Sequence, residues 1–180
     1  MVYLFLAEGF EEVEALTPVD LMRRAGIEVT TVGVGGEYVT GAHGITVKAD
    51  ICEGCADPEC EDLEMVVLPG GMPGTLNLKA SEKVNAFIDA AIDRGAYVAA
   101  ICAAPSILGE KGLLEGKMAT CYPGFEDKLR GAMTFDVGVI AAGNIITARA
   151  AGSAIDFAAE LIGALKGEDA AEEILDQIHA

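Results

Sequence analysis

The sequence predicts an α/β fold in which a doubly wound, mostly parallel sheet carries helices on both faces. Short apolar segments typical of strands alternate with amphipathic segments of helical period along the 180 residues. The strand-like segments are apolar throughout, which is typical of strands buried on both faces. Such an alternation requires crossover connections, and these favour parallel strands.

The first half of the chain shows this alternation clearly. Val13, Leu16, Val19 and Met22 recur at helical spacing, and Gly26 closes that predicted helix. After the turn at Gly35, alternating residues fit an edge strand or a hairpin. The predicted elements are a strand over 2–7, a helix over 10–25, a strand over 27–34, the edge strand or hairpin over 40–50, and a strand over 65–68.

The second half continues the pattern to the end of the sequence. Ser81 is a suitable N-cap for an amphipathic helix that ends at Arg94. The predicted elements are a helix over 81–94, a strand over 96–101, a helix over 104–111, strands over 117–121, 137–141 and 145–148, and helices over 153–166 and 170–178. We find no repeat or linker that divides the chain, so we expect a single domain over 1–180.

Composition excludes several classes of partner. The net charge of −17, with no basic cluster, argues against nucleic acid and anionic membranes, since both require Lys and Arg. The first residues contain no basic segment, and their apolar run is too short for a signal peptide or a membrane span. We therefore expect a cytoplasmic protein whose five cysteines are reduced thiols.

Three predicted strands end in segments that carry chemically useful groups. They are Ala7-Glu8-Gly9 leading into the turn Glu11-Glu12-Val13-Glu14, Leu68-Pro69-Gly70-Gly71, and Ala100-Ile101-Cys102-Ala103. In a doubly wound sheet such groups collect in the crevice beyond the carboxyl ends of the strands. We expect the three segments to meet there.

Cys102 is the candidate nucleophile of this crevice. It lies between a predicted strand and a predicted helix, and the N–H groups at a helix N-terminus favour the thiolate. The glycines after Leu68 leave N–H groups free to bind a developing oxyanion. The alternative is a small residue buried in the core, which is a common environment for free cysteine.

Four segments together resemble the ThiJ/PfpI superfamily, and within it the branch of the Parkinsonism-associated deglycase. They are EGFEEVEALTPVDLMRRAGI (8–27), LPGG (68–71), AAICAAP (99–105) and GSAIDFAAELIGALKG (152–167). The resemblance covers nearly the whole chain in the right order. It implies a flavodoxin-like fold similar to class I glutamine amidotransferases, and a homodimer.

The resemblance also implies roles for individual residues. Cys102 would be an oxidisable nucleophile, and Glu14 the carboxyl that hydrogen-bonds its sulfur. Gly71 and Ala103 would supply N–H groups to an oxyanion site, with Gly70 in the same pocket. A carboxyl buried beside a thiolate should have a raised pKa, so we expect Glu14 to be protonated and to donate to sulfur. The alternative places Glu14 on a solvated helix face.

Other positions limit the chemistry or remain open. Tyr122 occupies the place of the family histidine, and tyrosine is a poor general base at neutral pH. His43 falls where relatives place a basic residue near the cysteine pocket, or else it is an exposed loop residue. Arg24 and Asp20 match residues that relatives use near a dimer interface, or else they are surface charges.

A cluster of further cysteines occurs in ICEGCADPEC. Cys52, Cys55 and Cys60 include a C-x2-C half-site, with Cys121 as a distant fourth candidate ligand. A redox-active pair is a second alternative, although the acidic flanks disfavour thiolates. We expect ordinary solvent-facing or half-buried thiols, and we expect no metal.

Three functions follow as alternatives. The first is cofactor-free, glyoxalase-type or deglycase-type chemistry on small reactive carbonyls or their adducts, with Cys102 as the nucleophile. The second is a redox-sensing or protective chaperone in which Cys102 is oxidised to sulfinic acid. The third, an amidase or peptidase, depends on superfamily analogy alone.

Overall fold

The structure is a computed structural model that describes residues 1–180. Its main sheet contains β1 (Val2–Leu6), β2 (Val29–Gly33), β5 (Ile51–Cys52), β6 (Met65–Leu68), β7 (Tyr97–Ile101), β10 (Val139–Ala142) and β11 (Ile145–Ala148). The strands are ordered β10-β11-β7-β6-β1-β2-β5. Neighbours are parallel except for β10 and β11, which are antiparallel at one edge. The predicted mostly parallel sheet is confirmed.

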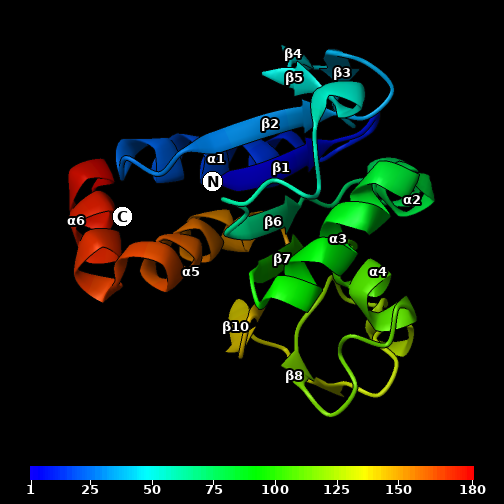
Figure 1. Cartoon of the computed structure of the whole chain (residues 1–180). Coiled ribbons are helices and arrows are strands. Elements are labelled where there is room, and N and C mark those ends of the chain that lie inside the picture. The colour runs from blue at the N-terminus through cyan, green and yellow to red at the C-terminus, as the bar shows by residue number, and fades with distance from the viewer.

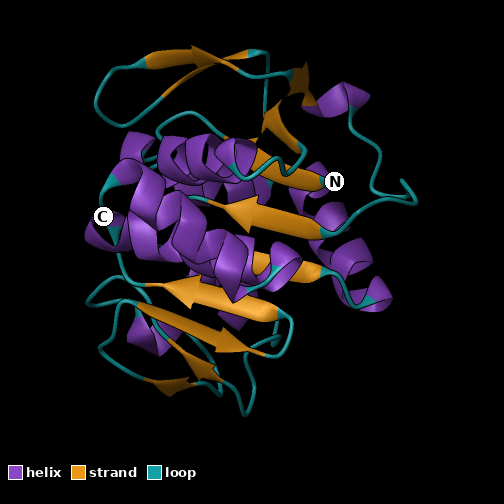
Figure 2. Cartoon of the chain, turned by 90° about the vertical axis from the view of Figure 1, so that its left-hand side faces the viewer, coloured by secondary structure: helices purple, strands orange, loops and turns teal.

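Helices cover both faces of this sheet, as predicted. One layer contains α1 (Glu12–Arg24), α5 (Ala154–Lys166) and α6 (Glu168–Ile178). The other contains α2 (Gly74–Ala80), α3 (Glu82–Arg94) and α4 (Pro105–Glu110). Figure 1 shows α5 and α6 apart from α3 and α4, and in Figure 2 the strands cross between purple helices.

Strand β1 shows why the central strands are apolar throughout. Val2 and Leu4 point into the core under α1 and α5. Tyr3 and Phe5 point to the opposite face, where their rings contact Phe87 of α3 at centroid distances of 4.8 and 5.0 Å. Burial of each side chain of this size stabilises the fold by about 1.5–3 kcal/mol. Because alternate residues of β1 point to opposite faces, this one strand packs against both layers of helices.

Two predicted strands lie outside the main sheet. The segment 40–50 belongs to an antiparallel hairpin of β3 (Tyr38–Thr40) and β4 (Thr46–Lys48), and the short β5 occupies the sheet edge instead. Within 117–121 only β8 (Met118–Ala119) is a strand, paired with β9 (Met133–Thr134). The Thr120 amide donates to the Thr147 hydroxyl at 3.0 Å, so a side-chain bond replaces the backbone bond of a longer strand.

The helix boundaries follow local chemistry. The Ser81 hydroxyl accepts a hydrogen bond from the Val84 amide at 3.2 Å, which confirms Ser81 as the cap of α3. Helix α2 was not predicted, because it has seven residues and follows a segment rich in glycine and proline. Short 3-10 turns are η1 (Glu53–Cys55), η2 (Glu126–Lys128) and η3 (Ala151–Ser153). No helix has both the length and the apolar composition needed to cross a membrane.

Candidate active site

The ends of β6 and β7 and the start of α1 bring Cys102 and Glu14 together. Leu68 and Ala100 are register partners on adjacent strands, so the segments that follow them leave the sheet side by side. The Glu14 carboxyl lies beside the Cys102 thiol in the crevice, close enough for each group to shift the pKa of the other. The segment after β1 joins them, because the Gly74 amide donates to the Gly9 carbonyl at 3.1 Å and the Glu11 amide to the Gly70 carbonyl at 3.0 Å, so the predicted meeting of the three segments is confirmed.

Cys102 has a backbone conformation that is rare for a residue with a side chain. Its φ is 66°, in the left-handed region. Its amide donates to the Ala148 carbonyl at 2.9 Å, and its carbonyl accepts from the Tyr122 amide at 2.8 Å. A conformation of this kind costs about 1–3 kcal/mol and persists only where its surroundings impose it. The two hydrogen bonds impose it here and keep Cys102 at the turn after β7.

Glu14 is buried, with 1% of its surface exposed. The Gly70 amide donates to its Oε2 at 2.9 Å. Burial raises the pKa of Glu14 to about 7, and hydrogen bonds with Cys102 and Gly70 limit the rise. The alternative of a solvated helix face is therefore wrong for Glu14.

Gly70 is required by the closeness of Glu14 and Cys102. A Cβ at this position would lie 2.6 Å from the Cys102 Cβ, 2.6 Å from Glu14 Oε2 and 3.0 Å from the Cys102 Sγ. Gly71 has a φ of +92°, a conformation that also favours glycine. The LPGG motif thus allows the backbone to pass directly over the thiol.

The thiol of Cys102 ionises less easily than expected. Burial and the charge of Glu14 raise its pKa to about 12, while the N–H groups of Gly71 and Ala103 act to lower it. We expected the helix N-terminus to favour the thiolate, but α4 is only six residues long and begins at Pro105. Close packing against a carboxyl outweighs that influence.

Glu14 and Cys102 therefore titrate as a pair. The Glu14 proton leaves near pH 7 and the Cys102 proton near pH 12, because burial and the negative charge of ionised Glu14 both oppose the thiolate. Between these values the remaining proton lies on the Cys102 sulfur, and the Glu14 carboxylate beside it is free to accept it. Such a pair can ionise the sulfur during attack and return the proton afterwards.

A small apolar pocket of about 180 Å³ opens beside the thiol. It is lined by Gly71, Met72, Cys102, Ala103, Tyr122 and Phe125. The rings of Tyr122 and Phe125 meet edge to face at 6.4 Å, and Tyr122 is half-exposed. Tyr122 therefore contributes its amide and its ring to the site. Sequence analysis missed Met72 and Phe125, because nothing in their local pattern distinguishes a pocket wall from an ordinary loop residue.

His43 lies outside this pocket. Its ring Nδ1 is 3.0 Å from Glu12 Oε2, and its imidazole is exposed. The hydrogen bond to Glu12, with the charge of Glu11, raises the pKa of His43. In this structure His43 is therefore an exposed loop residue, as the second alternative from the sequence proposed.

Glu12 is buried, which the sequence did not predict. Its Oε1 accepts from the amides of His43 and Ile45 at 2.9 and 3.3 Å and so fixes the turn between β3 and β4. Glu11, Glu12 and His43 are a group whose potential metal-ligand atoms lie within 4.8 Å of one another. The hydrogen bond between His43 Nδ1 and Glu12 Oε2 joins two of these atoms, so an ion bound by His43 Nδ1 would have to replace that bond.

Arg24 and Asp20 form an exposed ion pair along α1, with 3.1 Å between Arg24 Nε and Asp20 Oδ2. Neither residue lines the Cys102 pocket. Their place at a dimer interface stays a prediction.

Comparison with known proteins identifies the family of this chain. Residues 1–164 match the DJ-1/PfpI family. The chain belongs to the DJ-1/PfpI family. The resemblance inferred from the LPGG and AAICAAP motifs is confirmed, and the flavodoxin-like fold of the DJ-1/PfpI family matches the observed sheet and its helices.

Individual DJ-1/PfpI relatives match over nearly their full lengths. Protein dj-1beta of Drosophila melanogaster is 34% identical over 174 residues, which cover 95% of this chain and 92% of the relative. A Pyrococcus abyssi protein named a deglycase is 30% identical over 167 residues, or 92% of this chain and 99% of the relative. The solved structure of oxidised DJ-1 from Toxoplasma gondii has a TM-score of 0.93 at 34% identity, and the match covers 98% and 96% of the two chains.

Proposed function

We propose that this protein acts on small reactive carbonyl compounds, or on their adducts with amines and thiols, through Cys102 and without a cofactor. The observation that carries the proposal is the left-handed Cys102 beside the buried carboxyl of Glu14. The relative from Pyrococcus abyssi that is named a deglycase supports the same class of chemistry. A pocket of about 180 Å³ suits small compounds, because pockets for drug-sized ligands usually measure about 300–1,000 Å³.

The first step is addition of sulfur to an aldehyde carbon. The thiol proton passes to the Glu14 carboxylate as the S–C bond forms, and the carbonyl π electrons move to oxygen. The N–H groups of Gly71 and Ala103, which already act on the sulfur, stabilise the resulting oxyanion. Glu14 then returns the proton to this oxygen and gives a neutral hemithioacetal. All later proton transfers fall to Glu14, because Tyr122 is a poor base.

Loss of methylglyoxal in the presence of the purified protein tests this function. Cys102→Ser should reduce the rate to that of buffer alone, and Glu14→Gln should reduce it about 10²–10⁴-fold, as expected for loss of a general acid–base. Cys60→Ser is the matched control, since Cys60 lies outside the pocket and should keep the original rate. Equal rates for the original protein and Cys102→Ser would refute the proposal.

The groups around the Cys102 sulfur also support a second function, that of a redox sensor or protective chaperone. Oxidation of Cys102 to sulfinic acid would place oxygen atoms near the N–H groups of Gly71 and Ala103 and near Glu14. Each of two hydroperoxide molecules transfers one oxygen to sulfur and leaves as an alcohol or water. A relative, DJ-1 from Toxoplasma gondii, has been solved in an oxidised form. Intact mass after mild peroxide should show two added oxygens on Cys102 first, and random addition across the cysteines would contradict this role.

We also propose that the protein forms a homodimer through one face of α1. Val13 and Leu16 are 49% and 38% exposed although both are apolar. Asp20 and Arg24 continue the same face at helical spacing. Exposed apolar residues on one helix face, continued by a charged pair, are typical of an interface with a polar rim.

A further inference from the structure

A pair of thiols lies at the end of β5, at the edge of the sheet and away from β7 and Cys102. Cys52 ends this edge strand and Cys55 ends the 3-10 turn η1. Their Sγ atoms are 3.5 Å apart, with Cys52 half-buried and Cys55 exposed. A disulfide requires about 2.05 Å, so closure needs an approach of about 1.5 Å.

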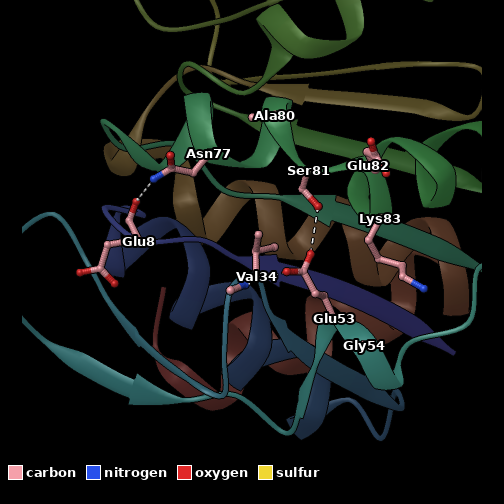
Figure 3. A pocket seen from close by; sticks show the side chains of 10 residues that line it. Glu8, Val34, Glu53, Gly54, Asn77, Ala80, Ser81, Glu82 and Lys83 are labelled. Carbon is pink, nitrogen blue, oxygen red and sulfur yellow. Dashed lines mark hydrogen bonds between the residues drawn. The ribbon is translucent and has the colours of Figure 1, made fainter.

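The backbone on both sides of the pair is held in place. Cys52 pairs with Gly33 of β2 at the edge of the sheet. The Glu53 carboxylate accepts from the Gly35 amide at 2.8 Å and from the Ser81 hydroxyl at 3.1 Å, the second bond being drawn in Figure 3. After the turn, the Lys83 ammonium donates to the Ala56 carbonyl at 2.9 Å. These contacts keep the two thiols facing each other.

The site is also open to small molecules. A groove of about 730 Å³ lies next to the η1 turn and is lined by Glu53 and Gly54 of that turn and by Ser81 and Lys83 across from it (Figure 3), although neither cysteine lines it. The exposed thiol of Cys55 lets an oxidant or a reductant reach the pair directly.

The two thiols differ in their acidity. Hydrogen bonds from the Cys55 thiol and from the Cys55 and Gly54 amides lower the pKa of Cys52, while the partnership with Cys52 raises the pKa of Cys55. We expected the acidic flanks to disfavour thiolates at both positions. The charge of Glu37, which is not one of these flanks, raises the pKa of Cys55, while at Cys52 the hydrogen bond from the Cys55 thiol is the main cause of the lowered pKa.

The other cysteines do not compete for this pair. Cys60 lies close to the Tyr3 side chain instead. Cys121 is buried after β8, which lies near β10 and β11 at the opposite end of the sheet from β5. The four-cysteine metal site considered from the sequence therefore does not assemble in this fold.

We propose that Cys52 and Cys55 form a reversible dithiol–disulfide pair that responds to hydroperoxides independently of Cys102. The Cys52 sulfur attacks a peroxide oxygen and becomes a sulfenic acid, and the alcohol or water leaves. The Cys55 sulfur then attacks the Cys52 sulfur, forms the S–S bond and releases water. Two thiols lose two electrons in total, and the hydroperoxide accepts them.

Reduction of the Cys52–Cys55 disulfide depends on the same difference in exposure and acidity between the two thiols. An external dithiol attacks the exposed Cys55 sulfur, and Cys52 leaves as the more stable thiolate. A second attack by the same dithiol restores both thiols and oxidises the reductant to its disulfide. The pair is thus a reversible sensor, whereas sulfinic acid at Cys102 is not reversed by thiols.

Mass spectrometry of the intact Cys102→Ser protein tests this proposal. After treatment with hydrogen peroxide the protein should lose two hydrogen atoms, and one peptide should contain the Cys52–Cys55 bond. Dithiothreitol should restore the original mass. Cys60→Ser in the same background is the matched control and should keep the effect, while Cys55→Ser should abolish it.

Three outcomes of the peroxide experiment would contradict the formation of this disulfide. No loss of two hydrogens, a bond that contains Cys60, or disulfides only between molecules would each overturn the proposal. Because the Cys102 thiol is absent, failure here leaves the carbonyl chemistry untouched. Circular dichroism of each variant verifies that the chain is folded, and Cys52→Ser provides a second variant that should also lack the disulfide.

Discussion

The Gly70 amide donates to Glu14 Oε2 at 2.9 Å, and no side chain fits between Gly70 and the thiol of Cys102. This contact joins the end of β6 to the first turn of α1. It also places a buried carboxyl, with its raised pKa, beside the only cysteine that has a left-handed backbone.

Gly70→Ala should damage both stability and reactivity. The new Cβ would lie 2.6 Å from Glu14 Oε2 and from the Cys102 Cβ. Overpacking of this kind typically costs about 1–3 kcal/mol, which urea unfolding would measure. Gly36→Ala is the control, because a Cβ there meets nothing within 4 Å. Equal effects of the two substitutions would show that Gly70 is not constrained.

Glu14 should make the protein less stable as pH rises from 4.5 to about 7. In this range the unfolded chain releases the Glu14 proton while the folded chain retains it. The contribution is fully present below pH 4.5 and lost above about 7. At 1.36 kcal/mol per pH unit, the loss amounts to about 3 kcal/mol.

Urea unfolding of the original protein and Glu14→Gln across this range measures the effect. The difference between their free energies of unfolding should change with pH, since only the glutamate titrates. Glu173→Gln, on the exposed face of α6, should run parallel to the original protein. A constant difference for Glu14→Gln would contradict a raised pKa.

The pH dependence of Cys102 alkylation should reveal the shared proton. Loss of the first proton from the pair should give a rise in rate with a midpoint of about pH 7. Glu14→Gln removes the group that accepts the thiol proton, so the midpoint should move upward and the rate at pH 7 should fall at least about tenfold. Iodoacetamide labelling followed by peptide mass analysis reports the rate at Cys102 alone. An unchanged pH dependence of alkylation in Glu14→Gln would show that Glu14 does not accept the Cys102 proton.

Tyr122→Phe should leave carbonyl consumption within about twofold of the original rate. The site uses the Tyr122 amide and ring, both of which phenylalanine retains. Tyr122→Ala should reduce the rate, because it removes one wall of the pocket. A large loss on changing to phenylalanine would assign the hydroxyl a role in proton transfer. Methylglyoxal consumption at pH 7 makes the comparison.

Leu16→Asp should convert the proposed dimer to a monomer. The substitution places a charge on the exposed apolar face of α1 without touching the core. Light scattering after gel filtration measures the mass directly. Met133→Asp, at an apolar position on β9 that is 53% exposed, is the control and should stay dimeric. A monomeric original protein would exclude this interface.

The sequence by itself determined the layered α/β fold, the crevice at the strand ends and the position of Cys102. These features depend on patterns that are local and strong: apolar strands buried on both faces, helices of clear period, and glycines where the backbone must pass closely. The shortest helices and strands could not be predicted from the sequence. Helix α2 and the two-residue β5 are too short to show a period, and β8 is held by a side-chain bond that the sequence does not show.

Only the tertiary structure decided which charged or reactive groups become buried or paired. Glu11, Glu12 and Glu14 look alike in the sequence, yet Glu12 closes a hairpin turn and Glu14 faces a thiol. Likewise, the spacing of Cys52 and Cys55 allows several environments, and the hydrogen bonds of Glu53 place them in contact. The physical reason is that a pKa depends on desolvation and on neighbouring charges, and distant parts of the chain supply both.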